Sequence, residues 1–153
     1  MTDAARNAAV LIAREAGWRE PEAGSDGECR FSLDGGLDFS LVSPDGRTVF
    51  LHADLGPAPD PETPEGDGML RALGGYAAGA MTARRSVLSV SGGRLQLHLA
   101  FPAQAPAASM LDNARIFLND LEWWQAQVRR AAAPQTTPSF FFDGGFNPNF
   151  LSL

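Results

Sequence analysis

The sequence predicts an α+β fold in which helices pack on a twisted antiparallel sheet, in the order α-β-β-β-α-β-β-α. Three observations lead to this prediction. The first and last long segments repeat apolar residues every three or four positions, as amphipathic helices do. Five segments between them alternate apolar and polar residues with a period of two, which is typical of strands that bury one face. Short glycine-rich turns join the strands of each hairpin, so paired strands run antiparallel.

Three segments have the apolar spacing of helices. The first covers residues 3–17, with Asp3 or Thr2 as the N-cap and Gly17 as the C-terminal stop. The second covers residues 69–80 and contains three glycines, each of which costs about 1 kcal/mol relative to alanine in a helix. The third, at residues 107–131, is the longest. The glycine-rich helix must be held by packing, either on its own core or against another element or subunit.

Five segments have the alternation of strands: residues 29–33, 37–41, 48–55, 86–91 and 94–101. The first three form an antiparallel meander, and the last two form a second hairpin. The third strand is apolar on both faces at Val49, Phe50 and Leu51, so we expect it to lie inside the sheet or under a partner. Residues 18–27 and 56–67 are predicted loops, because glycine and proline interrupt regular structure.

The chain has 153 residues, the usual size of one domain. We divide it into an α+β domain at residues 1–131 and an aromatic, turn-rich C-terminal tail at residues 132–153. Five of the ten phenylalanines lie in this tail. An exposed tail of this kind would promote aggregation. We therefore expect it to dock on its own subunit or on a neighbour, with a free tail as the alternative.

Charge and cysteine content exclude several classes of function. Twelve basic and eighteen acidic residues give a net charge of −6, so we expect no nucleic-acid partner, because phosphate contacts need clustered Lys and Arg. The sequence has no basic amphipathic stretch and no run of about 18 apolar residues, so we expect no membrane insertion. A single cysteine, Cys29, excludes an intramolecular disulfide and any multi-cysteine metal site. A reducing, cytoplasmic setting fits best.

Few residues have the arrangement that catalysis requires. His52 and His98 lie in predicted strands and could pair with Asp54 or Asp38, but no nucleophile or metal-binding motif accompanies them. Cys29 lies on the apolar face of a strand, and we interpret it as a buried, unreactive thiol. We expect no catalytic residue, no cofactor and no metal ion, and a protein that is not an enzyme. A small-ligand-binding domain or an enzyme that uses either histidine remains an alternative.

The order of the elements resembles the class I type III secretion chaperones of Gram-negative bacteria, the Tir-chaperone group, which bind and escort effectors. The resemblance covers roughly residues 3–131. It depends on size, acidity and element order, and on the stretches CRFSLDGGLDFSLV, LSVSGGRLQLHLAF and ARIFLNDLEWWQAQV.

The resemblance implies a homodimeric chaperone in the cytoplasm of a Gram-negative bacterium. In this family the second helix and the fourth strand lie near the dimer interface, which here would be residues 69–80 and 86–91. The expected dimer contacts are Leu73, Tyr76, Ala77, Leu88 and Val90. The implied partner is a secreted effector, whose N-terminal segment binds in extended, unfolded form and stays soluble and competent for secretion. The secretion ATPase is a further implied partner.

The resemblance also places the cargo on apolar patches of the first helix and the meander, where it can add a strand to the sheet edge. Val10 and Leu11 lie off the main apolar stripe of the first helix, and the third strand is more apolar than one buried face requires. The expected cargo contacts are Val10, Leu11, Phe31, Leu41, Phe50 and Leu51. Which strand face is exposed stays open, because a shift of one residue in register turns every side chain over.

A regulatory protein of the secretion system is a second interpretation. It would share the fold but sequester another chaperone or a transcriptional activator instead of escorting an effector.

Overall fold

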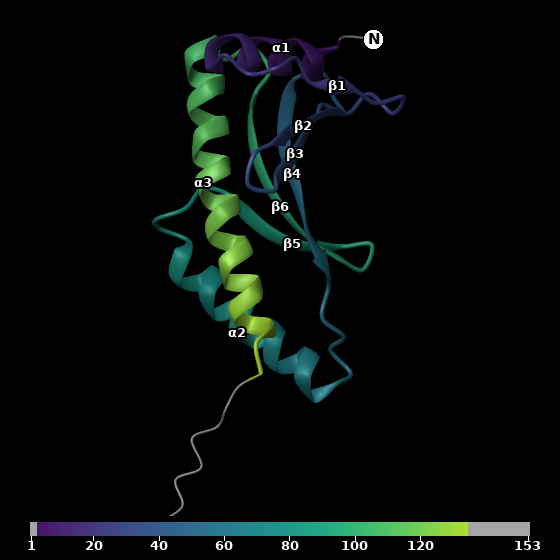
Figure 1. Ribbon diagram of the computed structural model, residues 1–153, viewed down its shortest axis with the longest axis vertical. Helices are drawn as coiled ribbons and strands as arrows, with labels where there is room; N and C mark the ends of the chain where they lie inside the picture. The colour runs from purple at the N-terminus through teal and green to yellow at the C-terminus, as the bar shows by residue number, and fades with distance from the viewer. Residues whose placement is uncertain (1–2, 135–153) are drawn as a thin grey trace, which may run out of the picture.

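The computed structural model describes residues 3–134, which form three helices and one six-stranded antiparallel sheet (Figure 1). The helices are α1 (Ala4–Ala16), α2 (Pro64–Ala80) and α3 (Ala107–Ala132). The strands are β1 (Glu22–Ala23), β2 (Cys29–Leu33), β3 (Leu37–Val42), β4 (Thr48–Pro57), β5 (Val87–Ser91) and β6 (Arg94–Pro102). Their order in the sheet is β1-β2-β3-β4-β6-β5. The predicted α+β class is confirmed. The prediction that the aromatic tail docks concerns residues 135–153, which lie outside the described residues.

The helices lie on one face of the sheet, here called the inner face. Figure 1 shows α3 along the long axis of the molecule, with α1 near its N-terminal end and α2 near its C-terminal end. Because successive side chains of a strand point to opposite faces, the burial of side chains alternates along β4. Val49 and Leu51 are buried on the inner face, whereas Phe50 and His52 point to the opposite face, here called the outer face. No helix among residues 3–134 combines the length and the apolar character that crossing a membrane requires.

Aromatic side chains connect the meander to the helices in a single core. Phe31 of β2 and Phe39 of β3 are paired in register and stack with their ring centroids 4.9 Å apart. The ring of Phe39 also lies 6.0 Å from that of Phe117 in α3. Trp18, which follows α1, meets both strand rings edge-on. These contacts hold α1 and α3 against the same strands.

Three differences from the sequence prediction exceed one residue. Part of the predicted loop 18–27 forms β1, which pairs with the first two residues of β2. The loop predicted at 56–67 is shorter at both ends. At its start, the positive φ of Gly56 accommodates a bulge, so β4 stays paired with β6 as far as Pro57. At its end, α2 begins at Pro64, because the Thr63 hydroxyl caps the helix by accepting a hydrogen bond from the N–H of Gly66.

A buried carboxylate joins α3 to the segment that leads from α2 into β5. Asp120 accepts hydrogen bonds from the guanidinium of Arg84 (3.0 Å) and from the backbone N–H (3.0 Å) and hydroxyl (2.7 Å) of Ser86. The backbone N–H of Arg85 also donates to Asp120, at 3.3 Å. The Arg84 guanidinium lies 4.4 Å from the ring centroid of Trp123. Together these contacts determine where β5 starts relative to α3.

The substitution Asp120→Ala should lower the free energy of unfolding by about 3–5 kcal/mol, because it leaves the buried donors of Ser86 and Arg84 without an acceptor. Urea unfolding followed by circular dichroism measures this loss. Asp112→Ala is the matched control, since Asp112 is exposed on the same helix and forms only a surface ion pair with Arg115 at 3.8 Å. Equal stability of the two variants would show that Asp120 does not hold the segment between α2 and β5 against α3.

Candidate functional site

The structure divides the six predicted cargo contacts into two groups. Phe31, Leu41 and Leu51 lie on the inner face and are 4%, 0% and 0% exposed. The expectation that these three side chains offer an apolar surface is therefore wrong, because the helices cover the face to which they point. Val10, Leu11 and Phe50 are half-buried and remain accessible. Val10 and Leu11 lie on α1, and Phe50 lies on the outer face of β4 between Val42 and Ala100.

A hollow lies beside the N-terminal end of α1. It has a volume of about 960 Å³ and lies between the start of α1, residues 24–27 and residues 42–46. Val42 lines this hollow and is also the register partner of Phe50.

The edge of the sheet at β2 is only partly occupied. β1 has two residues and pairs only with Cys29 and Arg30. Within the described part of the chain, residues 31–33 of β2 have no neighbouring strand on that side. Such an edge presents unpaired backbone groups to which an extended segment can hydrogen-bond.

The predicted dimer contacts lie on α2 and on β5, the opposite edge strand. Leu73 is buried in the core of its own protomer, so its predicted role as a surface contact is wrong. Tyr76, Ala77 and Leu88 are half-buried against the core, and Val90 is 57% exposed. Tyr76, Ala77, Leu88 and Val90 therefore remain predicted dimer contacts, whereas Leu73 points into the core.

Large exposed apolar side chains gather at the same end of the molecule. Met81, at the end of α2, is 78% exposed, and Val87 in β5 is 63% exposed. In α2, a Cβ added at Gly74, Gly75 or Gly79 would meet no atom within 4 Å. The protomer itself therefore does not need these glycines for close packing. Contact of this helix with another chain stays a prediction.

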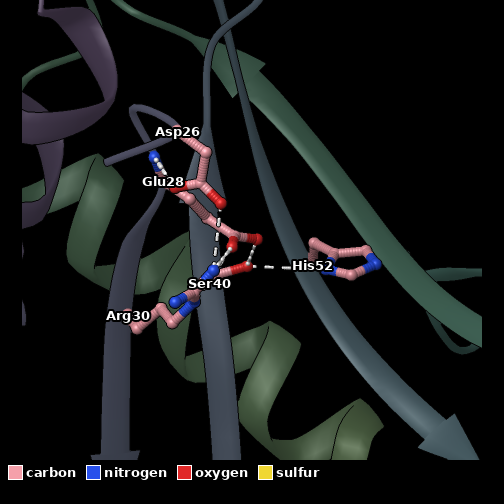
Figure 2. A network of polar contacts seen from close by, with 5 residues as sticks. All are labelled: Asp26, Glu28, Arg30, Ser40 and His52. Atoms are coloured by element: carbon pink, nitrogen blue, oxygen red, sulfur yellow. Dashed lines mark hydrogen bonds and ion pairs between the residues drawn. The ribbon is translucent and has the colours of Figure 1, made fainter. Parts of the chain in front are cut away.

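A row of polar side chains crosses the outer face (Figure 2). The Arg30 guanidinium donates to Glu28 at 2.7 Å, and the Ser40 hydroxyl donates to the other oxygen of Glu28 at 2.6 Å. Ser40 Oγ also lies 3.4 Å from His52 Nδ1. The ring of His52 is 5.0 Å from that of His98, its register partner in β6. The outer face thus carries interacting polar groups from β2 to β6.

Two groups of this row have pKa values shifted from their ordinary values, Glu28 in the segment before β2 and His98 in β6. The hydrogen bond from Ser40, followed by the contacts with Arg30, holds the pKa of Glu28 below its ordinary value. Burial lowers the pKa of His98, and the neighbouring His52 lowers it further. His98 Nε2 lies 2.9 Å from Ser89 Oγ in β5, so the row reaches the far edge strand.

This geometry gives little support to the alternative that the protein is an enzyme or binds a small ligand through its histidines. The two histidines contact each other on an open sheet face, and neither lines the two cavities at α1 and at β5. Among residues 3–134, no three His, Cys, Asp or Glu side chains lie close enough to hold a metal ion together. Cys29 is buried as expected, and burial raises the pKa of its thiol, which disfavours the nucleophilic thiolate.

Sequence reasoning missed two groups that shape these surfaces. Asn113, Asp120 and Gln127 are buried polar residues at seven-residue spacing in α3. This spacing places polar residues on the apolar side of the predicted helix. It was the sequence signal that could have indicated the contacts of Asp120 with Arg84 and Ser86. The Glu28–Ser40 contact was hidden because Glu28 lies between the predicted loop 18–27 and the predicted strand 29–33.

Neither a protein-family model nor a curated protein sequence matches the chain. Solved structures do match its fold. The ExsC–ExsE complex matches with a TM-score of 0.60 at 17% identity, over 82% of this chain and 94% of the other. The HopA1–SchA chaperone–effector complex matches with a TM-score of 0.55 at 13% identity, over 78% and 91%.

The Yersinia pestis type III secretion chaperone SycH, solved with a stable fragment of YscM2, matches with a TM-score of 0.54 at 13% identity. That match covers 80% of this chain and 98% of the other. The chain therefore has the fold of type III secretion chaperones, as its element order had indicated.

The stability of the fold should decrease between pH 7.5 and pH 5.5, in part because of His98. Its folded-state pKa lies below the ordinary value of 6.5, so the unfolded chain binds more protons in this range. His98→Gln should remove this contribution, which cannot exceed about 1.4 kcal/mol per pH unit for one proton. Urea unfolding at both pH values measures it. Parallel pH dependences of the parent and the variant would contradict the assignment.

Proposed function

We propose that this protein is a type III secretion chaperone that binds the N-terminal segment of a secreted effector in extended, unfolded form. It would act in the cytoplasm of a Gram-negative bacterium and keep the effector soluble and competent for secretion. The observation that carries this proposal is the match over about four fifths of the chain to structures solved as complexes with a second protein. The proposed activity is binding alone, without a catalysed reaction.

The accessible surfaces support binding to an extended chain. The open edge at residues 31–33 of β2 offers backbone hydrogen bonds, and these would provide affinity for many sequences. Val10 and Leu11 on α1 and Phe50 on the outer face would add selectivity for apolar side chains of the cargo. Phe31, Leu41 and Leu51 are not part of this proposed surface, because they are buried.

We also propose that the active form is a homodimer, paired through α2 and β5. Tyr76, Ala77, Leu88 and Val90 are the proposed contacts, together with the exposed side chains of Met81 and Val87. Burial of these side chains in a dimer would remove the most exposed apolar area of the described residues from water. An interaction with the secretion ATPase remains a proposal that rests on the resemblance alone.

Effector binding should be lost when charge is placed on the accessible apolar residues. Leu11→Asp and Phe50→Asp should each weaken binding at least about tenfold, equivalent to about 1.4 kcal/mol, because each puts a carboxylate in an apolar contact. Affinity purification from the native bacterium with mass spectrometry identifies the bound effector. Isothermal titration with its N-terminal segment then measures the affinity of each variant.

Asn7→Asp is the matched control on α1, since Asn7 is exposed and polar. It should bind like the parent, and circular dichroism should show that all three variants fold. Full binding by both folded aspartate variants would remove Leu11 and Phe50 from the cargo surface. Purification with another chaperone or a transcriptional activator, and with no exported protein, would contradict the effector-binding role and favour the regulatory alternative.

Dimerisation gives an independent test. Light scattering after size-exclusion chromatography should give about twice the mass of one chain, and Val90→Asp should give a folded monomer because it buries a charge in the interface. Ser32→Asp, on the exposed face of β2, should stay dimeric. A parent protein that is monomeric at micromolar concentration would overturn the proposed dimer.

A further inference from the structure

The two histidines of the chain meet on the outer face of the sheet. His52 of β4 and His98 of β6 are register partners, and their ring centroids are 5.0 Å apart. Both side chains are half-buried and lie on the face that the helices leave uncovered. The expectation that the protein holds no metal ion considered each histidine alone in its strand, whereas the pairing of β4 with β6 brings the two together.

The separation of the two rings suits a shared metal ion. Zinc binds imidazole nitrogens at about 2.0–2.1 Å, so two rings on one tetrahedral zinc ion have their centroids about 5 Å apart. Opposite residues of an antiparallel pair have Cβ atoms about 4.5–5.5 Å apart, so the paired strands themselves hold both rings at this distance. The ring planes are inclined by 35°. Because the χ2 torsion of histidine is soft, the rings can turn toward a common point without movement of either strand.

Hydrogen bonds determine which nitrogen of His52 is free to bind. The Ser40 hydroxyl has a single proton, which it donates to Glu28 at 2.6 Å. Its oxygen can therefore only accept from His52 Nδ1, which lies 3.4 Å away, so Nδ1 carries the ring proton. The lone pair of the neutral ring is then on Nε2, on the side of the ring away from Ser40 (Figure 2).

These contacts resemble the outer shell of a metal site. A histidine that binds a metal ion usually donates its other ring N–H to a carboxylate or another polar group, which fixes the ring and makes it a better ligand. For His52, the Ser40 hydroxyl relays this contact to the Glu28 carboxylate. For His98, Nε2 lies 2.9 Å from Ser89 Oγ, which leaves Nδ1 without a partner among residues 3–134. Each ring is thus oriented by a hydroxyl group and keeps one nitrogen for a ligand.

We propose that His52 and His98 bind one divalent transition-metal ion between β4 and β6, His52 through Nε2 and His98 through Nδ1. Imidazole is a good ligand for zinc, copper and nickel, whereas calcium and magnesium prefer oxygen. Water completes the coordination, since the described residues place no third His, Cys, Asp or Glu within reach of the pair. The site is formed within one chain and depends neither on effector binding nor on dimerisation.

Titration of the full-length, tag-free, chelator-treated chain with zinc chloride tests the proposal. Isothermal titration should show one saturable site per chain. His52→Gln and His98→Gln should each weaken binding at least about tenfold, and Ser40→Ala should weaken it about tenfold through loss of the contact with Glu28. Ser32→Ala is the matched control, since Ser32 is an exposed serine on β2, and it should bind like the parent. Circular dichroism should show that all four variants fold.

The ring nitrogens report the site directly, because the chain has only two histidines. In a long-range ¹H–¹⁵N spectrum, one equivalent of zinc should shift Nε2 of His52 and Nδ1 of His98 together, while Nδ1 of His52 stays protonated. The proposal fails if zinc does not bind saturably, or if either histidine variant binds like the parent. A shift of one ring alone would identify an adventitious ion only. Zinc on Nδ1 of His52, or parent-like binding by Ser40→Ala, would overturn the assigned orientation of His52.

Discussion

Coverage of one sheet face by helices is the constraint on which the rest of the structure depends. Every strand residue that points to α1 or α3 must be apolar, and the alternation then makes its neighbours face outward. The outer face is kept compatible with water by the polar row from Arg30 and Glu28 through Ser40 to His52 and His98. Apolar residues that remain accessible, such as Phe50, are few and local, so they stand out as candidate contacts.

The two edges of the sheet differ for physical reasons. At one edge, β1 is too short to cover β2, so residues 31–33 keep an open side to which an extended segment can add. At the other edge, β5 is tied to α3 through the contacts of Asp120 with Arg84 and Ser86. These contacts place the apolar side chains of β5 next to the end of α2. The two elements together form an exposed apolar surface. We propose that the first edge binds the extended segment and that the second edge pairs with another chain.

Much of the fold could be predicted from sequence, because α1, α3 and the hairpins have clear periodicity. β1 could not, since two residues carry no alternation, and the start of α2 was hidden in the prolines before Pro64. Period two shows which residues share a face but not which face the helices cover, so Phe31, Leu41 and Leu51 were named as candidate contacts although they point to the core. Leu73 was misassigned for a similar reason: helical spacing groups it with Tyr76 but does not separate core from interface. The fold-level resemblance supplied what periodicity could not, namely a reason for leaving apolar residues exposed.

Hydrogen–deuterium exchange of the complex with its effector segment tests the central claim, that an unfolded chain binds along α1 and the open edge of the sheet. The account predicts slower exchange on binding for the amides of α1 and for the amides at residues 31–33 that face the free edge of β2. Exchange in the buried part of α3 should stay unchanged, which shows that the core is not reorganised. Protection confined to α2 and β5, with none at α1 and β2, would contradict the account.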